Sequence, residues 1–173
     1  ALEMLLTDGG LPRAVANGAA VLAVCAGFQL IGTKLPGRDG AIVAGVGLVD
    51  AETQYTSDPR CVGELVADSS IELPGEQMLT GFENHQGRTL LGPDTKPLGV
   101  VTRGVGNGLG SGPAGEGVCE GKVFGTYMHG PVLARNPQLA DRILASVVGE
   151  LAPFHDEWAE ALAAERRATL QVS

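Results

Sequence analysis

The sequence predicts an α/β fold in which antiparallel strands are added to a parallel core. Apolar residues at 19–24 are followed at once by Cys25 and a short apolar segment, the pattern of a strand, a sharp turn and a helix. A second apolar strand, 121–128, leads directly into His129. Further apolar stretches follow one another without long helices between them, at 41–49, 61–67, 77–83 and 98–103. Such stretches are typical of hairpins or edge strands.

The first elements are defined by proline and glycine. Pro12 suits the first turn of a helix and Gly18 suits its C-terminal cap, so residues 11–17 are predicted to form the helix before the 19–24 strand. The helix after Cys25 begins at about Ala26 and is expected to end before Pro36.

The C-terminal part is predicted to form two helices. Asn136 is a good N-cap residue, and Pro137 fits the first helical position. Four residues of this helix lie on one apolar face: Leu139, Ile143, Leu144 and Val147. A last helix is expected from about Pro153, with Phe154, Trp158 and Leu162 at four-residue spacing. That stripe indicates core packing or a docking face.

Residues 104–117 are rich in glycine and are expected to form a flexible surface loop. Within them, residues 110–115 formally match the GxGxxG pattern of dinucleotide-binding proteins. No strand directly precedes this match, a proline interrupts it and no helix opens after it, so a dinucleotide site is excluded.

Composition restricts the class of protein. A length of 173 residues with 44% hydrophobic residues indicates one domain with a substantial core. The net charge of −8 and the absence of a basic stripe exclude nucleic-acid binding, and no apolar run approaches a membrane span. The three cysteines form no CxxC pair, which argues against a disulfide framework or a metal site and favours the cytoplasm.

Cys25 and His129 are the candidate catalytic residues. A cysteine in a turn between strand and helix exposes its sulfur near the positive end of the helix dipole, which predicts a lowered thiol pKa. A histidine at the end of a neighbouring strand is well placed to act as its base. The alternative is a buried free cysteine, the usual state of a lone cysteine.

The residues around both positions resemble a known family. Residues 25–29, CAGFQ, resemble the Cys-x-Gly-x-Gln signature of class I glutamine amidotransferases. Residues 125–130, GTYMHG, resemble the histidine motif of the branch that includes cobyrinate and cobyrate synthases. Two further blocks, 81–89 and 130–137, are similar to the GatD group, the glutaminase subunits of lipid II isoglutaminyl synthase. The resemblance runs to about Leu144 and implies a flavodoxin-like doubly wound sheet with added antiparallel strands.

Two departures from the family pattern matter. Pro131 stands where the common triad has a glutamate two residues after the histidine; the GatD and cobyrate branch also lacks that glutamate, so no motif names the group that orients His129. Family members carry further βα elements before the elbow, including a glycine-rich segment that supplies an oxyanion amide. This chain begins at Ala1 without Met, so residues 1–173 are expected to be a single glutaminase domain lacking its N-terminal βα elements.

The resemblance implies hydrolysis of L-glutamine through a thioester on Cys25, with His129 moving the proton. The backbone amide of Ala26, the residue after the nucleophile, is the expected local oxyanion donor. Gln29, one helical turn on, is expected to hold the substrate; the alternative is a solvent-facing helix residue. Arg60 is a candidate for the substrate α-carboxylate or for gating, or else a solvated surface arginine.

The other two histidines are not expected to act in catalysis. His85 lies in one of the family blocks, and we expect a structural or partner-facing role for it. His155, at the start of a helix, is expected to be an ordinary surface residue.

The resemblance also implies a partner. The ammonia would pass to a Mur-ligase-like subunit of the MurT type, in a heterodimer that amidates the D-glutamate of lipid II to D-isoglutamine. No cofactor or metal is expected in this chain, which has no GxxxxGK[ST] motif, and ATP and Mg are expected on the ligase. Two alternatives stay open: a cobyrinate- or cobyrate-type amidotransferase domain, and an inactive binding or scaffold module.

Overall fold

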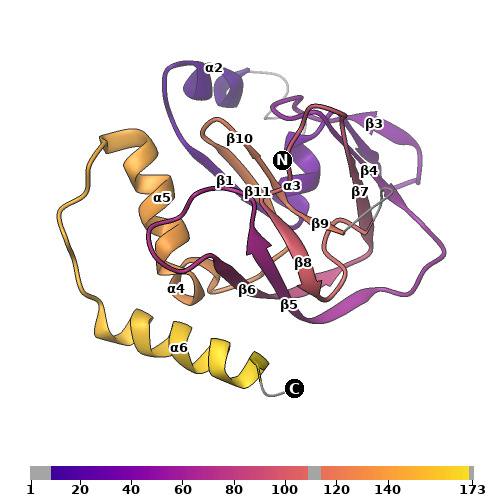
Figure 1. Cartoon of the computed structure of the whole chain (residues 1–173). Coiled ribbons are helices and arrows are strands. Elements are labelled where there is room, and N and C mark those ends of the chain that lie inside the picture. Colours follow the sequence, from indigo (N-terminus) through magenta and orange to yellow (C-terminus); the bar gives the residue numbers. More distant parts are fainter. Residues whose placement is uncertain (1–8, 109–113, 172–173) are drawn as a thin grey trace.

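The computed structural model describes residues 9–108 and 114–171, which form an α/β structure with three sheets (Figure 1). The helices are α2 (Gly10–Ala16), α3 (Ala26–Ile31), α4 (Val132–Arg135), α5 (Pro137–Val148) and α6 (Glu157–Gln171). The strands are β1 (Val21–Val24), β2 (Lys34–Pro36), β3 (Ile42–Ala44), β4 (Ala51–Tyr55), β5 (Cys61–Ser69), β6 (Met78–His85), β7 (Gly87–Leu91), β8 (Gly99–Arg103), β9 (Gly115–Glu116), β10 (Val118–Glu120) and β11 (Val123–Thr126).

The central sheet has the order β1-β11-β10 and holds the predicted parallel pair (Figure 1). β1 and β11 run parallel, with Val24 opposite Thr126, while β10 is antiparallel to β11. The two faces of β11 are covered by different core clusters: Phe124 packs into one and Val123 into the other. A strand buried on both faces reads as a continuous apolar run, which is why the sequence pattern identified it.

The added antiparallel strands are confirmed. β6-β5-β8-β9 form one four-stranded antiparallel sheet, and β3-β2-β4-β7 form another in which only β2 and β4 are parallel. The β5–β6 ladder runs from Cys61 opposite His85 to Asp68 opposite Met78. This long ladder brings residues 61 and 85 beside each other, and the His85 ring stacks on Tyr127, the residue that follows β11.

Several strands were not predicted. The helix after Cys25 ends before Pro36 as predicted, since α3 ends at Ile31, but Pro36 belongs to the short strand β2, which was not predicted. β4 has buried Ala51 and Thr53 alternating with exposed Glu52 and Gln54, and it pairs with β7. These strands are mostly polar, and their partners lie far away in the sequence, so local hydrophobicity does not reveal them.

Helix α5 starts where Asn136 and Pro137 predict, but for a different reason. The Asn136 side chain makes no capping bond. Its Oδ1 accepts from the Thr80 amide at 2.8 Å, and its Nδ2 donates to the carbonyls of Thr80 and Val132. Asn136 therefore ties the helix start to β6.

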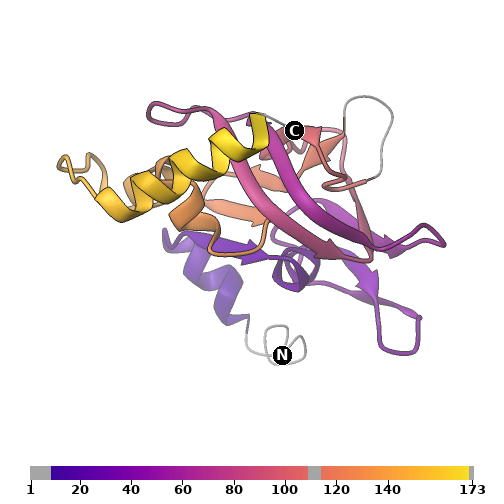
Figure 2. The ribbon, with the colours of Figure 1, turned by 90° about the horizontal axis from the view of Figure 1, so that it is seen from below.

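The apolar faces predicted for the last two helices are only partly buried. Leu139 is fully buried, whereas Leu144 and Val147 are more than half exposed. Helix α6 packs against α4 (Figure 2), but Phe154 and Trp158 are 85% and 87% exposed. The core interpretation of the Phe154–Trp158 stripe is therefore wrong. Among the described residues, no helix has both the length and the apolar character needed to cross a bilayer.

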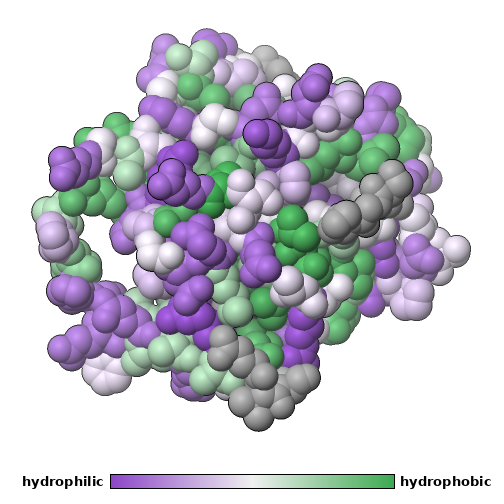
Figure 3. All heavy atoms as spheres, viewed as in Figure 1, coloured by the Kyte–Doolittle hydropathy of each residue, from purple (hydrophilic) through white to green (hydrophobic). Residues whose placement is uncertain are grey.

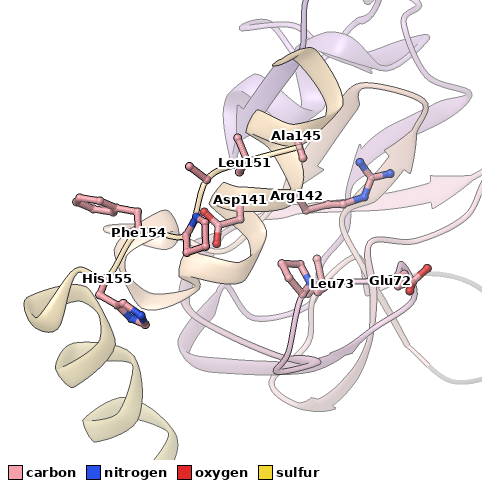
Figure 4. A pocket seen from close by; sticks show the side chains of 11 residues that line it. Glu72, Leu73, Asp141, Arg142, Ala145, Leu151, Phe154 and His155 are labelled. Carbon is pink, nitrogen blue, oxygen red and sulfur yellow. The ribbon is translucent and has the colours of Figure 1, made fainter. Parts of the chain in front are cut away.

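A hollow of about 720 Å³ lies between α5, the segment after it and the turn at residues 72–74. Figure 3 shows the opening between that connecting segment and the body of the molecule. Figure 4 shows Asp141 and Arg142 of α5 on one wall and Phe154 pointing away from it. None of the predicted site residues lines this hollow.

Candidate active site

Cys25 occupies the predicted elbow. It lies between β1 and α3 with φ 52° and ψ −108°, and it is the one non-glycine residue with positive φ in the described part of the chain. This left-handed conformation is costly for a residue with a side chain and persists only where the surroundings impose it. The Cys25 amide donates to the Thr126 carbonyl at 2.8 Å, which extends the β1–β11 pairing through the turn.

His129 leaves β11 at the same edge of the sheet. Because β1 and β11 are parallel and Val24 is opposite Thr126, both strands deliver their following residues to one edge. The His129 amide donates to the Phe82 carbonyl at 2.8 Å, so the segment after β11 is also fastened to β6. The ring atom Nε2 is buried and has no hydrogen-bond partner among the residues that the structure describes.

Arg60 and Asn84 complete this edge. The Arg60 Nε donates to Asn84 Oδ1 at 2.6 Å, and its terminal nitrogen donates to the Asn84 carbonyl at 3.1 Å. The same carbonyl lies 4.0 Å from the Cys25 sulfur. Through Asn84, an exposed guanidinium is thereby held close to the cysteine.

The predicted decrease in the Cys25 pKa is wrong. Burial raises the pKa of the Cys25 thiol above its ordinary value, and the Ala26 amide and the Arg60 charge, which both lower it, are the weaker effects. The helix that follows has only six residues. For His129, burial lowers the pKa, and the charges of His85 and Arg60 lower it further. Near neutral pH the thiol and the imidazole are therefore both uncharged.

Two other predicted residues lie around the cysteine. Ala26 is exposed and directly follows Cys25 at the start of α3, and its backbone amide is one of the groups that lower the pKa of the Cys25 thiol. Gln29 is buried, so the solvent-facing alternative is wrong. Its Nε2 donates to the Tyr127 hydroxyl at 3.3 Å, which places Gln29 on the interior side of the site.

Gln29 belongs to a buried polar cluster, made of Gln29, Thr89, Tyr127, His85 and Glu83. The Tyr127 hydroxyl bonds to Thr89 Oγ1 at 2.7 Å as well as to Gln29. The His85 ring stacks on the Tyr127 ring with centroids 3.7 Å apart. Sequence reasoning did not single out Tyr127, which joins this cluster although it lies only two positions before His129.

Glu83 and His85 form a buried ion pair at the centre of this cluster. His85 Nδ1 bonds to the Gly87 carbonyl at 2.8 Å and Nε2 lies 3.3 Å from Glu83 Oε2. Burial alone would raise the pKa of Glu83, but the bonds from His85 and from the Gly106 and Val105 amides lower it below its usual value. His85 is structural, and the partner-facing alternative is wrong because the residue is 2% exposed.

Glu83 also binds the glycine-rich segment 104–117, which was expected to be a flexible surface loop. Val105 and Gly106 donate to the two Glu83 oxygens at 2.9 Å, and Gly106 and Asn107 are buried. The described part of residues 104–117 is therefore fixed to the interior. Most of the GxGxxG match, residues 110–113, lies outside the described residues.

Cys61, Glu83 and His85 are the residues that could offer ligand atoms to a metal, since those atoms lie within 4.8 Å of one another. A tetrahedral site would use this mixture of sulfur, oxygen and nitrogen. However, both ring nitrogens of His85 and both Glu83 oxygens already have protein partners. Hydrogen bonding accounts for this arrangement without an ion.

Comparison with known proteins agrees with this geometry. Residues 3–137 match the family described as the CobB/CobQ-like glutamine amidotransferase domain. The chain is 39% identical to the GatD subunit of lipid II isoglutaminyl synthase (glutamine-hydrolyzing) from Streptococcus pneumoniae, over 78% of this chain and 50% of that protein. The corresponding subunit from Staphylococcus aureus is 35% identical over 78% and 51%. A probable cobyric acid synthase from Methanothermobacter thermautotrophicus is 34% identical over 64% and 23%.

The fold is also found among solved structures. A crystal structure of a glutamine amidotransferase superposes with a TM-score of 0.56 at 19% identity, covering 80% of this chain and 67% of that one. The chain spans about half the length of the two GatD subunits. On the strength of the family match and of the 39% and 35% identities, the chain belongs to the CobB/CobQ-like glutamine amidotransferase domain family.

Proposed function

We propose that this chain carries the glutamine-hydrolysing centre of a glutaminase subunit that supplies ammonia to a ligase. The observation that carries the proposal is the elbow: Cys25 is held at φ 52° on the same sheet edge as His129, in a chain of this family. Cysteine and histidine at adjoining strand ends are the minimum that nucleophilic acyl transfer requires.

In the first step the Cys25 sulfur attacks the side-chain carboxamide carbon of glutamine. His129, neutral because its pKa is lowered, accepts the thiol proton. The C–N bond then breaks, the proton on His129 passes to the departing nitrogen, and ammonia leaves. A γ-glutamyl thioester remains on Cys25.

In the second step water attacks the thioester carbon and gives a proton to His129. The C–S bond breaks, glutamate leaves, and the proton returns to the Cys25 sulfur. The amide of Ala26, the residue after the nucleophile, would stabilise the oxyanion in both steps.

Arg60 and Gln29 take different parts in this scheme. Arg60 would bind the α-carboxylate of glutamine from its position beside Asn84. Gln29 is buried and bonded to Tyr127, which favours support of the elbow from inside. Direct contact between Gln29 and the substrate would require its amide to leave that bond.

For the partner, we propose a Mur-ligase-like subunit of the MurT type that forms a heterodimer with the glutaminase. Two relatives in the 35–39% identity range are named as subunits of lipid II isoglutaminyl synthase, which supports this choice. The ligase would use ATP and Mg to activate the D-glutamate carboxylate of lipid II, and the ammonia would convert it to D-isoglutamine.

The test is reconstitution with the Mur-ligase-like protein of the same cell. We expect co-purification, glutamine hydrolysis and ATP-dependent amidation of a lipid II-type acceptor. Cys25→Ala should abolish hydrolysis and amidation but leave the complex intact. Glutamine hydrolysis without a complex and without ammonia transfer would contradict the proposed partner but support the proposed glutaminase activity. A complex without any hydrolysis would favour an inactive scaffold.

A cobyrinate- or cobyrate-type amidotransferase is the second candidate. It is supported by the 34% identity to a probable cobyric acid synthase, although the chain covers only 23% of that protein. The same assay separates the two, because ammonia transfer to a corrinoid carboxylate instead of a lipid II-type acceptor would select this alternative.

A further inference from the structure

Glu116 is a fully buried acid that the scheme above does not use. It lies in β9, opposite Gly99 of β8, and its exposed fraction is 0%. One carboxylate oxygen, Oε1, accepts from the Thr126 hydroxyl and from the Tyr127 amide. The other, Oε2, is buried without a partner. Burial of an acid costs free energy unless hydrogen bonds compensate for the lost solvation, and Glu116 has such bonds on only one of its two oxygens.

Asn107 holds Glu116 in place from both sides. The Asn107 amide donates to the Gly115 carbonyl, and its side chain bonds to both the carbonyl and the amide of Gly117, each at 2.8 Å. Gly117 has φ +61°, and a Cβ there would lie 2.2 Å from the Gly125 carbonyl oxygen. The residues on either side of Glu116 are therefore fixed against β11.

Thr126 connects Glu116 to both candidate catalytic residues. Its carbonyl accepts from the Cys25 amide at 2.8 Å, which fixes the elbow. Its hydroxyl donates to Glu116 and accepts from the Met128 amide at 2.9 Å, immediately before His129. Thr126 therefore fixes the chain that enters the elbow through its backbone carbonyl, and the chain that carries the base through its hydroxyl.

We propose that Glu116, acting through Thr126 and the Tyr127 amide, is the residue that positions Cys25 and His129 relative to each other. Pro131 occupies the place where a glutamate could have oriented the histidine ring directly, and His129 Nε2 has no partner. The position of His129 is instead set through its backbone, because Glu116 and Thr126 bind the chain that leads into it. This inference rests on the proposed glutaminase function, and Glu116 itself does not touch the substrate.

The charge state of Glu116 makes a specific demand on its variants. Burial raises the pKa of Glu116 to about 7, and the charge of Glu83 raises it as well. The bonds from Thr126 and Tyr127 and the charge of His85 lower the pKa, but they do not outweigh the effect of burial. The proton can reside on Oε2 while Oε1 keeps both of its bonds. The two bonds that Glu116 accepts, from Thr126 and from Tyr127, form a clamp that is therefore expected to hold in either charge state. Glu116→Gln, which keeps an acceptor at Oε1, should preserve this clamp.

The experiment compares variants that keep or remove the clamp, in the protein with its partner bound. Thr126→Val and Glu116→Leu are expected to lower kcat for glutamine hydrolysis about 10- to 100-fold with KM changed less than threefold. Thr126→Ser and Glu116→Gln should stay within about threefold of the natural protein. Leu73→Ala, a change at a buried residue that makes no part of the Glu116–Thr126 contact, controls for destabilisation alone and should leave kcat unchanged.

A second readout needs no glutamine hydrolysis. Iodoacetamide alkylation of Cys25, followed by peptide mass spectrometry, reports how far His129 assists the thiol. His129→Ala should slow alkylation in the natural protein, and in a Thr126→Val background it should have no further effect. This holds or fails whether or not glutamine is the substrate, so it separates this inference from the proposed function.

The inference is overturned if folded Thr126→Val and Glu116→Leu keep full kcat, or if KM changes instead of kcat. It is also overturned if His129→Ala slows alkylation in the Thr126→Val background as much as in the natural protein. Failure of both variants to fold would assign the Glu116–Thr126 contact to stability and would likewise overturn it.

Discussion

The edge that carries Cys25 and His129 and the buried polar cluster behind it use their polar atoms differently. At the edge, the Cys25 sulfur has only a long contact of 4.0 Å to the Asn84 carbonyl, and His129 Nε2 is unpartnered. In the cluster, His85 uses both ring nitrogens and the Tyr127 hydroxyl has two partners. Groups that must react are kept available, and groups that support them are satisfied, which is how a rigid site is built before substrate arrives.

The largest difference between the two regions should appear when their histidines are removed. His129→Ala is expected to lower the glutaminase rate on the order of 10²-fold or more with little change in stability, because a base is lost and no buried bond is broken. His85→Ala should mainly lower the melting temperature, since it removes a stacked, doubly bonded ring. Steady-state kinetics and thermal unfolding of both variants decide this. The reverse pattern would exchange the two roles.

The next prediction concerns the ion pair in the cluster. Glu83→Gln is expected to lower the free energy of unfolding by about 3 kcal/mol, because His85 and two backbone amides lose their charged acceptor in the interior. Urea unfolding measures this. Glu52→Gln, which removes an exposed ion pair with Lys34, is the matched control and should cost less than about 1 kcal/mol. Equal costs would mean that burial does not distinguish the two acids.

Glu116 provides a pH signature of the interior. Its pKa is about 7 in the folded chain and near 4.5 when unfolded, so folding retains its proton. The stabilising contribution of that proton is complete below about pH 4.5 and is lost as the pH rises through 7. Compared with Glu116→Gln, the natural protein should lose roughly 3 kcal/mol of unfolding free energy between pH 4.5 and pH 8. A constant difference across that range would contradict the assigned pKa.

A smaller effect is expected at the exposed rim. Arg60→Met should raise KM for glutamine about tenfold and change kcat less, because the guanidinium would bind a carboxylate that does not react. Arg103, which is also exposed, provides a matched arginine outside the site when changed to Met. A fall in kcat with constant KM would move Arg60 from substrate binding to the chemistry itself.

The same contrast explains what the sequence could predict. The elbow and β11 are each marked by a local signal, an apolar run followed by Cys25 or His129, so their positions could be predicted from the sequence. The Thr53–Thr89 bond and the Glu116–Thr126 bond join polar residues on different strands, 36 and 10 residues apart, and no local pattern marks them. The pKa of Cys25 was predicted in the wrong direction because the dipole of the following helix is local, whereas the burial that outweighs it is tertiary.

Labelling of the three cysteines tests the central claim most directly. Burial raises the pKa of Cys25, Cys61 and Cys119 alike, so thiol acidity alone does not favour Cys25. An electrophilic glutamine analogue should nevertheless label Cys25 first, because only that thiol belongs to the proposed glutamine site, and glutamine should protect it. Peptide mass spectrometry with time is expected to show Cys25 modified before the other two and slowed by His129→Ala. Equal labelling of all three cysteines, or labelling that glutamine does not slow, would contradict the assignment of Cys25 as the nucleophile.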